Sequence, residues 1–201
     1  MKSVFDFIVS PKGGRYNNEV KVGDKNLIVN SSIEKFKMIN RNAIVESVPA
    51  AFKTPIKVGD EIIIHHNVFR RWYNQKGKEV DSSKVFNDNK YFCQLDQVYA
   101  YKRDGEWKTL GQRCFVMPLK NTDQWDLDNE TRCKGILVYG NKSLSANDVN
   151  EGDIVGFKAN REFEFLIDGQ RLYCMESNDI LVKYERKGDE EAYNPSWAQS
   201  S

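Results

Sequence analysis

The chain has 201 residues and carries 30 Lys and Arg against 29 Asp and Glu, which gives a formal net charge of +1. This balance excludes the strongly basic field of a general nucleic-acid-binding protein, and only a local basic patch stays compatible with it. No apolar run reaches the roughly 18 residues of a membrane span, and the first residues lack the apolar core of a secretory signal, so we expect a cytoplasmic protein that crosses no membrane.

Short β-branched and aromatic runs separated by Gly, Asn and Asp dominate the chain, and no stretch carries the apolar period of a long helix. The predicted strands are 5–10, 42–48, 60–66, 90–94 and 98–102, then 113–118, 135–139, 153–158, 163–167, 170–175 and 180–185. Asp104-Gly105 and Asp168-Gly169 predict tight hairpin turns. The expected fold class is all-β, and about six short strands per half favour closure into a small barrel.

Three short patterns occur twice in the same order, which indicates a tandem repeat of one small unit. They are Phe7-Ile8-Val9-Ser10-Pro11-Lys12 with Phe115-Val116-Met117-Pro118-Leu119-Lys120, Val58-Gly59-Asp60-Glu61-Ile62-Ile63 with Glu151-Gly152-Asp153-Ile154-Val155, and Tyr91-Phe92-Cys93 with Leu172-Tyr173-Cys174. Two units of about 100 residues also fit the usual domain size. We predict one domain over 1–106, a second over 107–186, and a disordered acidic tail over 187–201.

The two copies differ in the segment that follows the first predicted strand. The interval from Phe7 to Ala43 is much longer than the interval from Phe115 to Gly135, so the first copy carries a polar insertion over 13–41 that the second lacks. Loops vary and bind partners while the framework that holds them is kept. The insertion is therefore the first place to look for function.

Catalytic and metal-binding signals are weak. The four cysteines form no C-x-x-C pair, and we expect free thiols, with Cys93 and Cys174 as small apolar residues of equivalent strands. His65 and His66 are the only histidines, and neighbouring positions of a strand point to opposite faces. No phosphate loop, nucleophile elbow or H-E-x-x-H motif occurs. We expect no enzymatic activity, no cofactor and no metal site.

Four segments of the second copy carry a family resemblance. In order, they are 115–120, the small-residue and apolar run with Gly-Asn over 134–141, the Val-x-x-Gly-Asp strand over 149–157, and the Met-Glu-Ser-x-Asp-Ile-Leu ending over 175–182. With them this copy resembles the co-chaperonins of the GroES type, the small rings that cap GroEL-type chaperonins. The first copy keeps the Val-x-x-Gly-Asp strand over 56–64 and a weaker closing segment over 93–100. The resemblance covers most of 4–186 and implies two tandem, irregular GroES-like β-barrels.

In the family, a long polar loop after the first strand binds the chaperonin through a short apolar segment. The resemblance assigns that role here to Leu27, Ile28 and Val29, three aliphatic residues inside a polar stretch. An alternative that depends on the residues alone is an ordinary hairpin, in which these residues pair with 19–22 through a turn at Gly23-Asp24. The hairpin and the binding role can coexist.

Two further segments have open interpretations. In the second copy, Trp125 and Leu127 are the candidates for a second chaperonin anchor, and the alternative is that Trp125 folds back onto its own barrel. In the first copy, the resemblance places the longer loop with Arg70, Arg71, Trp72 and Tyr73 on the roof of the dome, facing the client protein. Basic residues interleaved with aromatics also suit stacking on single-stranded nucleic acid.

Two functional hypotheses follow. The first is a co-chaperonin that assembles into a homo-oligomeric ring, binds a GroEL-type chaperonin and assists the folding of a client protein while the partner hydrolyses ATP. Seven equal units, usual for the family, cannot be built from whole tandem chains that use both barrels in one tier, because seven is odd. Either the number of units per ring differs, or the second barrel lies outside the ring. The divergence and the many Asn residues fit a virus-encoded version acting in the host cytoplasm. The second hypothesis is a non-enzymatic binding or virion-associated module that contacts single-stranded nucleic acid.

Overall fold

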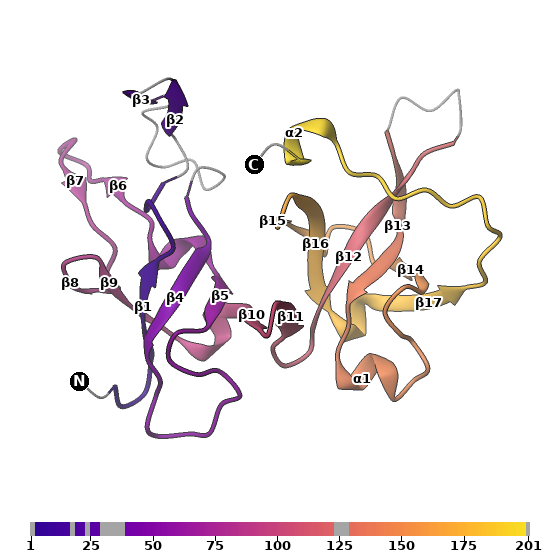
Figure 1. The fold of residues 1–201 in the computed structure, drawn as a ribbon, viewed down its shortest axis with the longest axis horizontal. Coiled ribbons are helices and arrows are strands. Elements are labelled where there is room, and N and C mark those ends of the chain that lie inside the picture. The colour runs from indigo at the N-terminus through magenta and orange to yellow at the C-terminus, as the bar shows by residue number, and fades with distance from the viewer. Residues whose placement is uncertain (1–2, 17–18, 23–24, 29–38, 123–128, 200–201) are drawn as a thin grey trace. The chain divides into compact units, whose positions relative to one another are not determined.

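The computed structural model describes residues 3–16, 19–22, 25–28, 39–122 and 129–199. The fold is all-β, as the sequence predicts, and the chain divides into two compact units (Figure 1). Unit 1 is Met1–Trp107 and unit 2 is Lys108–Ser201, so the division lies one residue after the predicted one. The two described α-helices have four residues each, and no described helix is long and apolar enough to span a membrane.

The main sheet of unit 1 has the strand order β11-β10-β5-β4-β1-β9-β8. The elements of this half of the chain are β1 (Phe7–Pro11), β2 (Glu19–Val22), β3 (Lys25–Ile28), β4 (Asn42–Ser47), β5 (Glu61–Ile64), the 3-10 turn η2 (His66–Val68), β6 (Trp72–Tyr73), β7 (Glu79–Val80), β8 (Val85–Asn87), β9 (Lys90–Cys93), η3 (Leu95–Gln97), β10 (Val98–Arg103) and β11 (Glu106–Thr109). Two separate hairpins, β2-β3 and β6-β7, stand outside this sheet.

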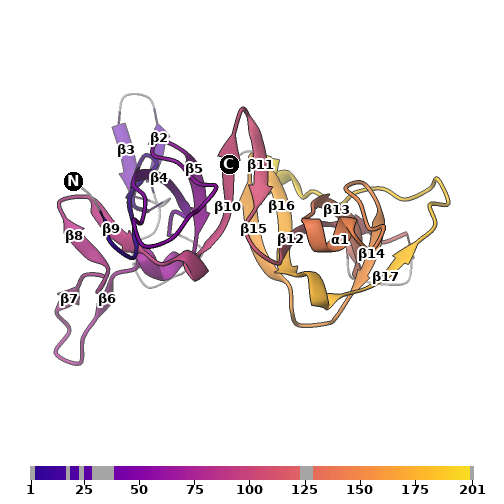
Figure 2. The same cartoon turned by 90° about the horizontal axis from the view of Figure 1, so that it is seen from below.

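The sheet of unit 2 has the order β15-β16-β12-β13-β14-β17, and Figure 2 shows these strands following one another. Its elements are β12 (Arg113–Lys120), β13 (Glu130–Tyr139), α1 (Lys142–Ser145), β14 (Ile154–Phe157), β15 (Phe163–Ile167), β16 (Gln170–Glu176), η4 (Ser177–Asp179), β17 (Ile180–Tyr184) and α2 (Ser196–Gln199). The order repeats β8-β9-β1-β4-β5-β10 of unit 1 strand for strand. Closure of either sheet into a barrel stays a prediction.

The repeated Gly-Asp turn has the same hydrogen bonds in both units. Gly59 N–H donates to the Val45 carbonyl over 2.8 Å, and Gly152 N–H donates to the Leu137 carbonyl over 2.7 Å. Both glycines have φ near +90°, at +88° and +91°, a region that favours glycine because it lacks a Cβ. In each turn the following Asp carboxylate accepts a backbone N–H from three residues earlier at 2.8 Å. The duplication therefore extends from the strand order to individual backbone contacts.

The cores repeat as well. Phe7 pairs with Cys93 across β1 and β9, and Phe115 pairs with Cys174 across β12 and β16. Both phenylalanines are fully buried, and both cysteines are buried with free thiols. These small sulfur side chains fill the space opposite a large ring, which is the packing role expected for them from sequence.

The C-terminal segment differs from the expected disordered tail. Its residues up to Gln199 are described, and they run back across unit 2 (Figure 1). Lys120 N–H donates to the Glu191 carbonyl, and Tyr193 N–H donates to the Pro118 carbonyl, each over 2.8 Å. Ala198 in α2 is fully buried. The acidic composition of this segment gave no sign that its backbone pairs with β12, because main-chain hydrogen bonds need no apolar pattern in the paired residues.

Candidate functional site

The insertion of unit 1 leaves the sheet through a closed neck, which we define as residues 14–16 and 39–40. Tyr16 and Ile39 form an isolated antiparallel bridge, and both are buried. Asn40 N–H donates to the Arg15 carbonyl over 3.1 Å, and Asn40 Nδ2 donates to the carbonyls of Lys12 and Gly14 over 2.8 and 2.7 Å. Asn40 is only 3% exposed, and these two bonds satisfy the donors of its buried amide. The neck holds the two ends of the insertion together.

Beyond the neck, the insertion contains the β2-β3 hairpin. Glu19 pairs with Ile28 and Val20 pairs with Leu27. The structure thus forms the hairpin that the sequence offered as an alternative, so the backbone of Leu27 and Ile28 lies in a strand. Val29 lies outside the described residues. Chaperonin binding by this segment stays a prediction.

The neck is bound to the loop that follows β5. Arg15 makes an ion pair with Asp81, and its Nε donates a 2.6 Å hydrogen bond to the Phe69 carbonyl. The Arg15 guanidinium carbon lies 5.0 Å from the centre of the Tyr91 ring, within the usual range of a cation–π contact. Burial opposes ionisation of the Asp81 carboxyl, but hydrogen bonds from Arg15 and the Ser82 backbone outweigh it and lower the Asp81 pKa.

A second arginine contacts the neck from the same loop. Arg71 N–H donates to the Tyr16 hydroxyl over 2.9 Å, and the Arg71 guanidinium carbon lies 4.8 Å from the centre of the Tyr16 ring. Arg71 also makes a 2.7 Å ion pair with Glu79 of β7. Arg71 is thereby held between the neck and the β6-β7 hairpin, and Figure 1 shows that hairpin at the end of unit 1 from which the insertion leaves.

The four predicted residues of this loop separate into two groups. Arg70, Trp72 and Tyr73 line one hollow of about 550 Å³ together with Asn67, Ser82 and Ser83. Arg71 does not line it, because its side chain is turned to Tyr16 and Glu79. Tyr73 is 49% exposed, whereas Phe69, just before the group, is fully buried against the Tyr91 ring at 4.9 Å. Phe69 fixes the position of the segment, and the sequence pattern did not single it out.

The matching place in unit 2 has no comparable insertion. Lys120 at the end of β12 pairs directly with Glu130 at the start of β13, and Asn121 N–H donates to the Asn129 carbonyl over 3.1 Å. The proposed second anchors, Trp125 and Leu127, lie outside the described residues. The described neighbours show only that 120–121 pair with 129–130.

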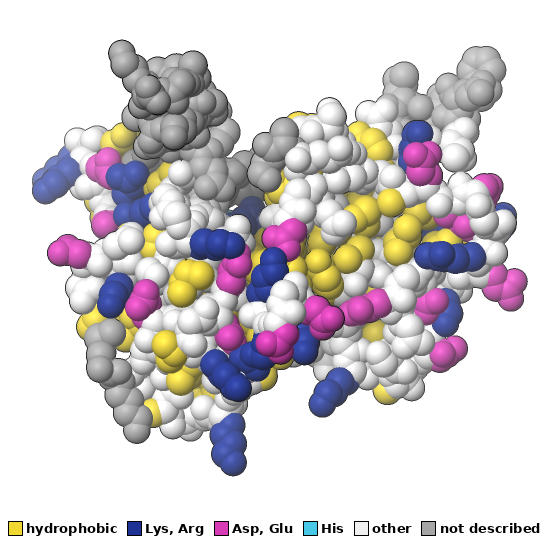
Figure 3. Space-filling model, viewed as in Figure 1, with side chains coloured by type: hydrophobic (Ala, Val, Ile, Leu, Met, Phe, Trp, Pro, Cys, Tyr) yellow, Lys and Arg dark blue, Asp and Glu magenta, His cyan; other side chains and the backbone are white. Residues whose placement is uncertain are grey.

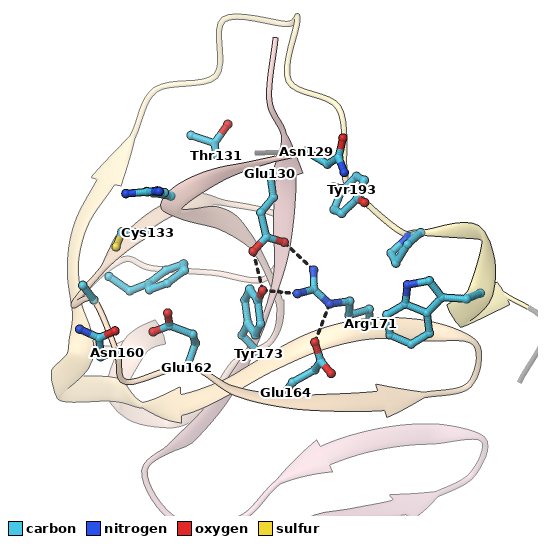
Figure 4. Close-up of a pocket in the computed structure, with 15 residues that line it drawn as sticks. Asn129, Glu130, Thr131, Cys133, Asn160, Glu162, Glu164, Arg171, Tyr173 and Tyr193 are labelled. Atoms are coloured by element: carbon cyan, nitrogen blue, oxygen red, sulfur yellow. Dashed lines mark hydrogen bonds and ion pairs between the residues drawn. The ribbon is translucent and has the colours of Figure 1, made fainter. Parts of the chain in front are cut away.

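Unit 2 contains a polar cavity of about 650 Å³ that the sequence did not indicate (Figure 4). Arg171 of β16 lies at its centre, with Nε 2.8 Å from Glu164 of β15 and a second ion pair to Glu130 of β13. The Tyr173 hydroxyl donates a 2.6 Å hydrogen bond to Glu130. Burial and the bond to Glu130 raise the pKa of Tyr173, so it stays protonated. Charged and polar side chains from three strands thus meet in one hydrogen-bonded network.

The histidine prediction was wrong in its geometry. The rings of His65 and His66 stack with centres 4.2 Å apart, because β5 ends at Ile64 and His66 begins the 3-10 turn η2. Burial, helped by the nearby His65, Arg41 and Arg70, lowers the pKa of His66 to about 4, so His66 is neutral near pH 7. A neutral, stacked ring beside two arginines is a packing group.

The described residues include no metal-binding cluster, and two of the buried thiols are held in the protonated form. No group of three or more His, Cys, Asp or Glu side chains in the described ranges is arranged to hold a metal ion. Burial raises the pKa of Cys114 and of Cys174 to about 12, so both remain thiols near neutral pH. On the viewed face, positive and negative side chains are interspersed, which fits the small net charge (Figure 3).

Comparison with models of known protein families finds no match, and comparison with curated protein sequences finds none either.

Proposed function

We propose that this protein is a co-chaperonin, which contacts a GroEL-type chaperonin through the insertion of unit 1. The observation that carries the proposal is an asymmetry between two copies of one scaffold. Unit 1 holds an insertion at a closed neck, and unit 2 joins the equivalent strands by a short connection. A partner-binding loop on one copy explains why that copy alone has the neck.

The energetics suit a reversible contact. Leu27, Ile28 and Val29 would each contribute about 2 kcal/mol on complete burial in a partner groove. Ordering the backbone of each residue costs about 1–2 kcal/mol. The net affinity of one insertion is therefore small, and several insertions on one homo-oligomeric ring would bind together through their high effective concentration. The partner would supply ATP hydrolysis, since the proposal requires no catalytic group from this chain.

The proposal changes the place expected for Arg70, Arg71, Trp72 and Tyr73. A roof of a dome lies opposite the chaperonin, but Arg71 contacts Tyr16 at the neck from which the chaperonin-binding insertion leaves. We therefore place this segment beside the chaperonin contact instead of on the roof.

The test is assembly of the intact chain with a GroEL-type chaperonin and ATP, followed by native mass spectrometry. We expect a complex with the natural chain and none with the Leu27→Ser, Ile28→Ser, Val29→Ser triple variant. The matched control replaces Val85 and Phe86, exposed apolar residues of β8 in the same unit, with Ser. Binding by the triple variant, or equal loss in the control, contradicts the role of the insertion.

A second candidate function is binding of single-stranded nucleic acid by the hollow of Arg70, Trp72 and Tyr73. The favouring observation is that one cation and two aromatic side chains line the same hollow, which is the combination that stacks on bases. Salt-dependent binding of a single-stranded oligonucleotide that is lost in Trp72→Ala, together with no chaperonin complex, would favour this function over the first.

A further inference from the structure

We propose that the β6-β7 hairpin and the neck form one interaction surface, held by a clamp of Arg15, Tyr16, Arg71 and Asp81. This inference rests on the proposed function and deepens it. The clamp would fix the direction in which the insertion leaves unit 1 and would add the basic hairpin to the surface that meets the partner.

The contacts of the clamp join two loops that are far apart in sequence. Arg15 reaches Asp81 and the Phe69 carbonyl, and Arg71 reaches back to the ring and hydroxyl of Tyr16. Each loop thus supplies one arginine to the other. The Arg15 side chain is only 16% exposed and its bond to the Phe69 carbonyl is partly buried, whereas Asp81 is half exposed, so solvent screens the ion pair more than the bond to the carbonyl.

The neck end of the clamp is itself fixed. Tyr16 and Ile39 are buried, and the Asn40 side chain ties the backbone on both sides of the insertion. The loop end is fixed by Phe69, which is fully buried in the core of unit 1. Because Arg15 and Arg71 connect two fixed segments, they restrict rotation of the chain at the neck. Part of the conformational entropy that binding would cost is therefore already lost in the free protein.

The hairpin brings an excess of positive charge to this surface. Arg71 is paired with Glu79, while Lys76 and Lys78 at the tip are exposed, and Arg70 lies at its base. Such a basic hairpin beside the neck fits an acidic rim around the groove of the partner. Complementary charge of this kind raises the association rate and makes it sensitive to salt.

Unit 1 also contains an arginine with similar contacts outside the clamp, which serves as a matched control for the clamp variants. Arg103 makes an ion pair with Asp60 and its guanidinium carbon lies 5.3 Å from the centre of the Tyr101 ring. Its chemistry and its 23% exposure are close to those of Arg15, but it lies at the Gly-Asp turn and not at the neck. Arg103→Ala therefore removes the same kind of contact without touching the clamp.

The first experiment measures hydrogen exchange of the backbone amides at the neck and in β2-β3 of the free full-length chain. We expect Arg15→Ala and Arg71→Ala each to raise exchange there about threefold to tenfold, the factor that one partly buried cation–π and ion-pair contact is worth. Arg103→Ala should leave these amides unchanged. Unchanged exchange in the clamp variants, or an equal rise with Arg103→Ala, overturns the clamp whatever the chaperonin does.

The second experiment measures affinity for a GroEL-type chaperonin with ATP at low and high salt. We expect Arg15→Ala to weaken binding about threefold to tenfold and the Lys76→Glu, Lys78→Glu double variant to weaken it more at low than at high salt. Equal affinity of the double variant and the natural chain overturns the hairpin's part in the surface. If no chain binds chaperonin while the exchange result holds, the proposed function fails and the clamp stands.

Discussion

Phe69→Ala should remove the anchor that holds the Arg70–Tyr73 segment in place. Phe69 is fully buried, and its ring meets Tyr91 edge to face at 4.9 Å. Truncation of a buried Phe to Ala typically costs about 3–5 kcal/mol, and the lost ring pair accounts for about 1 kcal/mol of that. Since domains are stable by only about 5–15 kcal/mol, unit 1 should lose a large part of its stability.

The control is Phe86→Ala, because Phe86 also makes an edge-to-face contact, with Phe92 at 5.1 Å, but is 39% exposed. We expect it to cost about 1 kcal/mol. Urea unfolding of the full chain, followed by hydrogen exchange in unit 1 and unit 2 separately, measures both. Phe69→Ala should lower the urea midpoint of unit 1 by about 2 M and leave unit 2 unchanged. Equal shifts for the two variants would refute the anchoring role of Phe69.

Three further predictions concern single positions. A Cβ on Gly135 would lie 2.4 Å from the Met117 carbonyl oxygen, so Gly135→Ala should destabilise unit 2 by about 1–3 kcal/mol in urea unfolding. Tyr173→Phe removes the hydroxyl that donates to Glu130 and should cost unit 2 about 1 kcal/mol in the same assay. The pKa of His66 falls from 6.5 to about 4 on folding, so the unfolded chain binds a proton first. Unit 1 should therefore have its full free energy of unfolding, as far as His66 is concerned, above pH 6.5, and should lose stability as the pH falls from 6.5 to 4. In His66→Gln, the free energy of unfolding of unit 1 should depend less on pH in this range.

The framework could be predicted because its signals are local. The Val-x-x-Gly-Asp pattern needs a positive φ at glycine and a carboxylate that caps the turn, and both units form it with the same bonds. Short apolar runs in the sequence predicted most of the strands of the two sheets. The hairpin of 19–22 with 25–28 was also visible, since two strand-like runs flank Gly23-Asp24.

The clamp and the cavity could not be predicted, because their contacts join residues far apart in sequence. Arg15 and Asp81 are separated by more than sixty positions, and nothing in their neighbourhoods marks a pair. Glu130 and Arg171 meet only because β13, β12 and β16 are neighbours in the sheet. The stacked histidines were missed for another reason: the strand ends two residues earlier than predicted, and a 3-10 turn changes the direction of the second ring.

The strand order explains how unit 1 can carry a long insertion without losing its sheet. The β1-β4 ladder continues to Pro11 paired with Ala43, so the framework is complete before the insertion begins. Lengthening a loop raises the entropic cost of closing it only slightly, by about 0.6 kcal/mol for each doubling of its length. Burial of Tyr16 and Ile39 at the neck offsets a cost of that size. An insertion on such a neck is nearly neutral for folding, which leaves its length and composition free to be set by a partner.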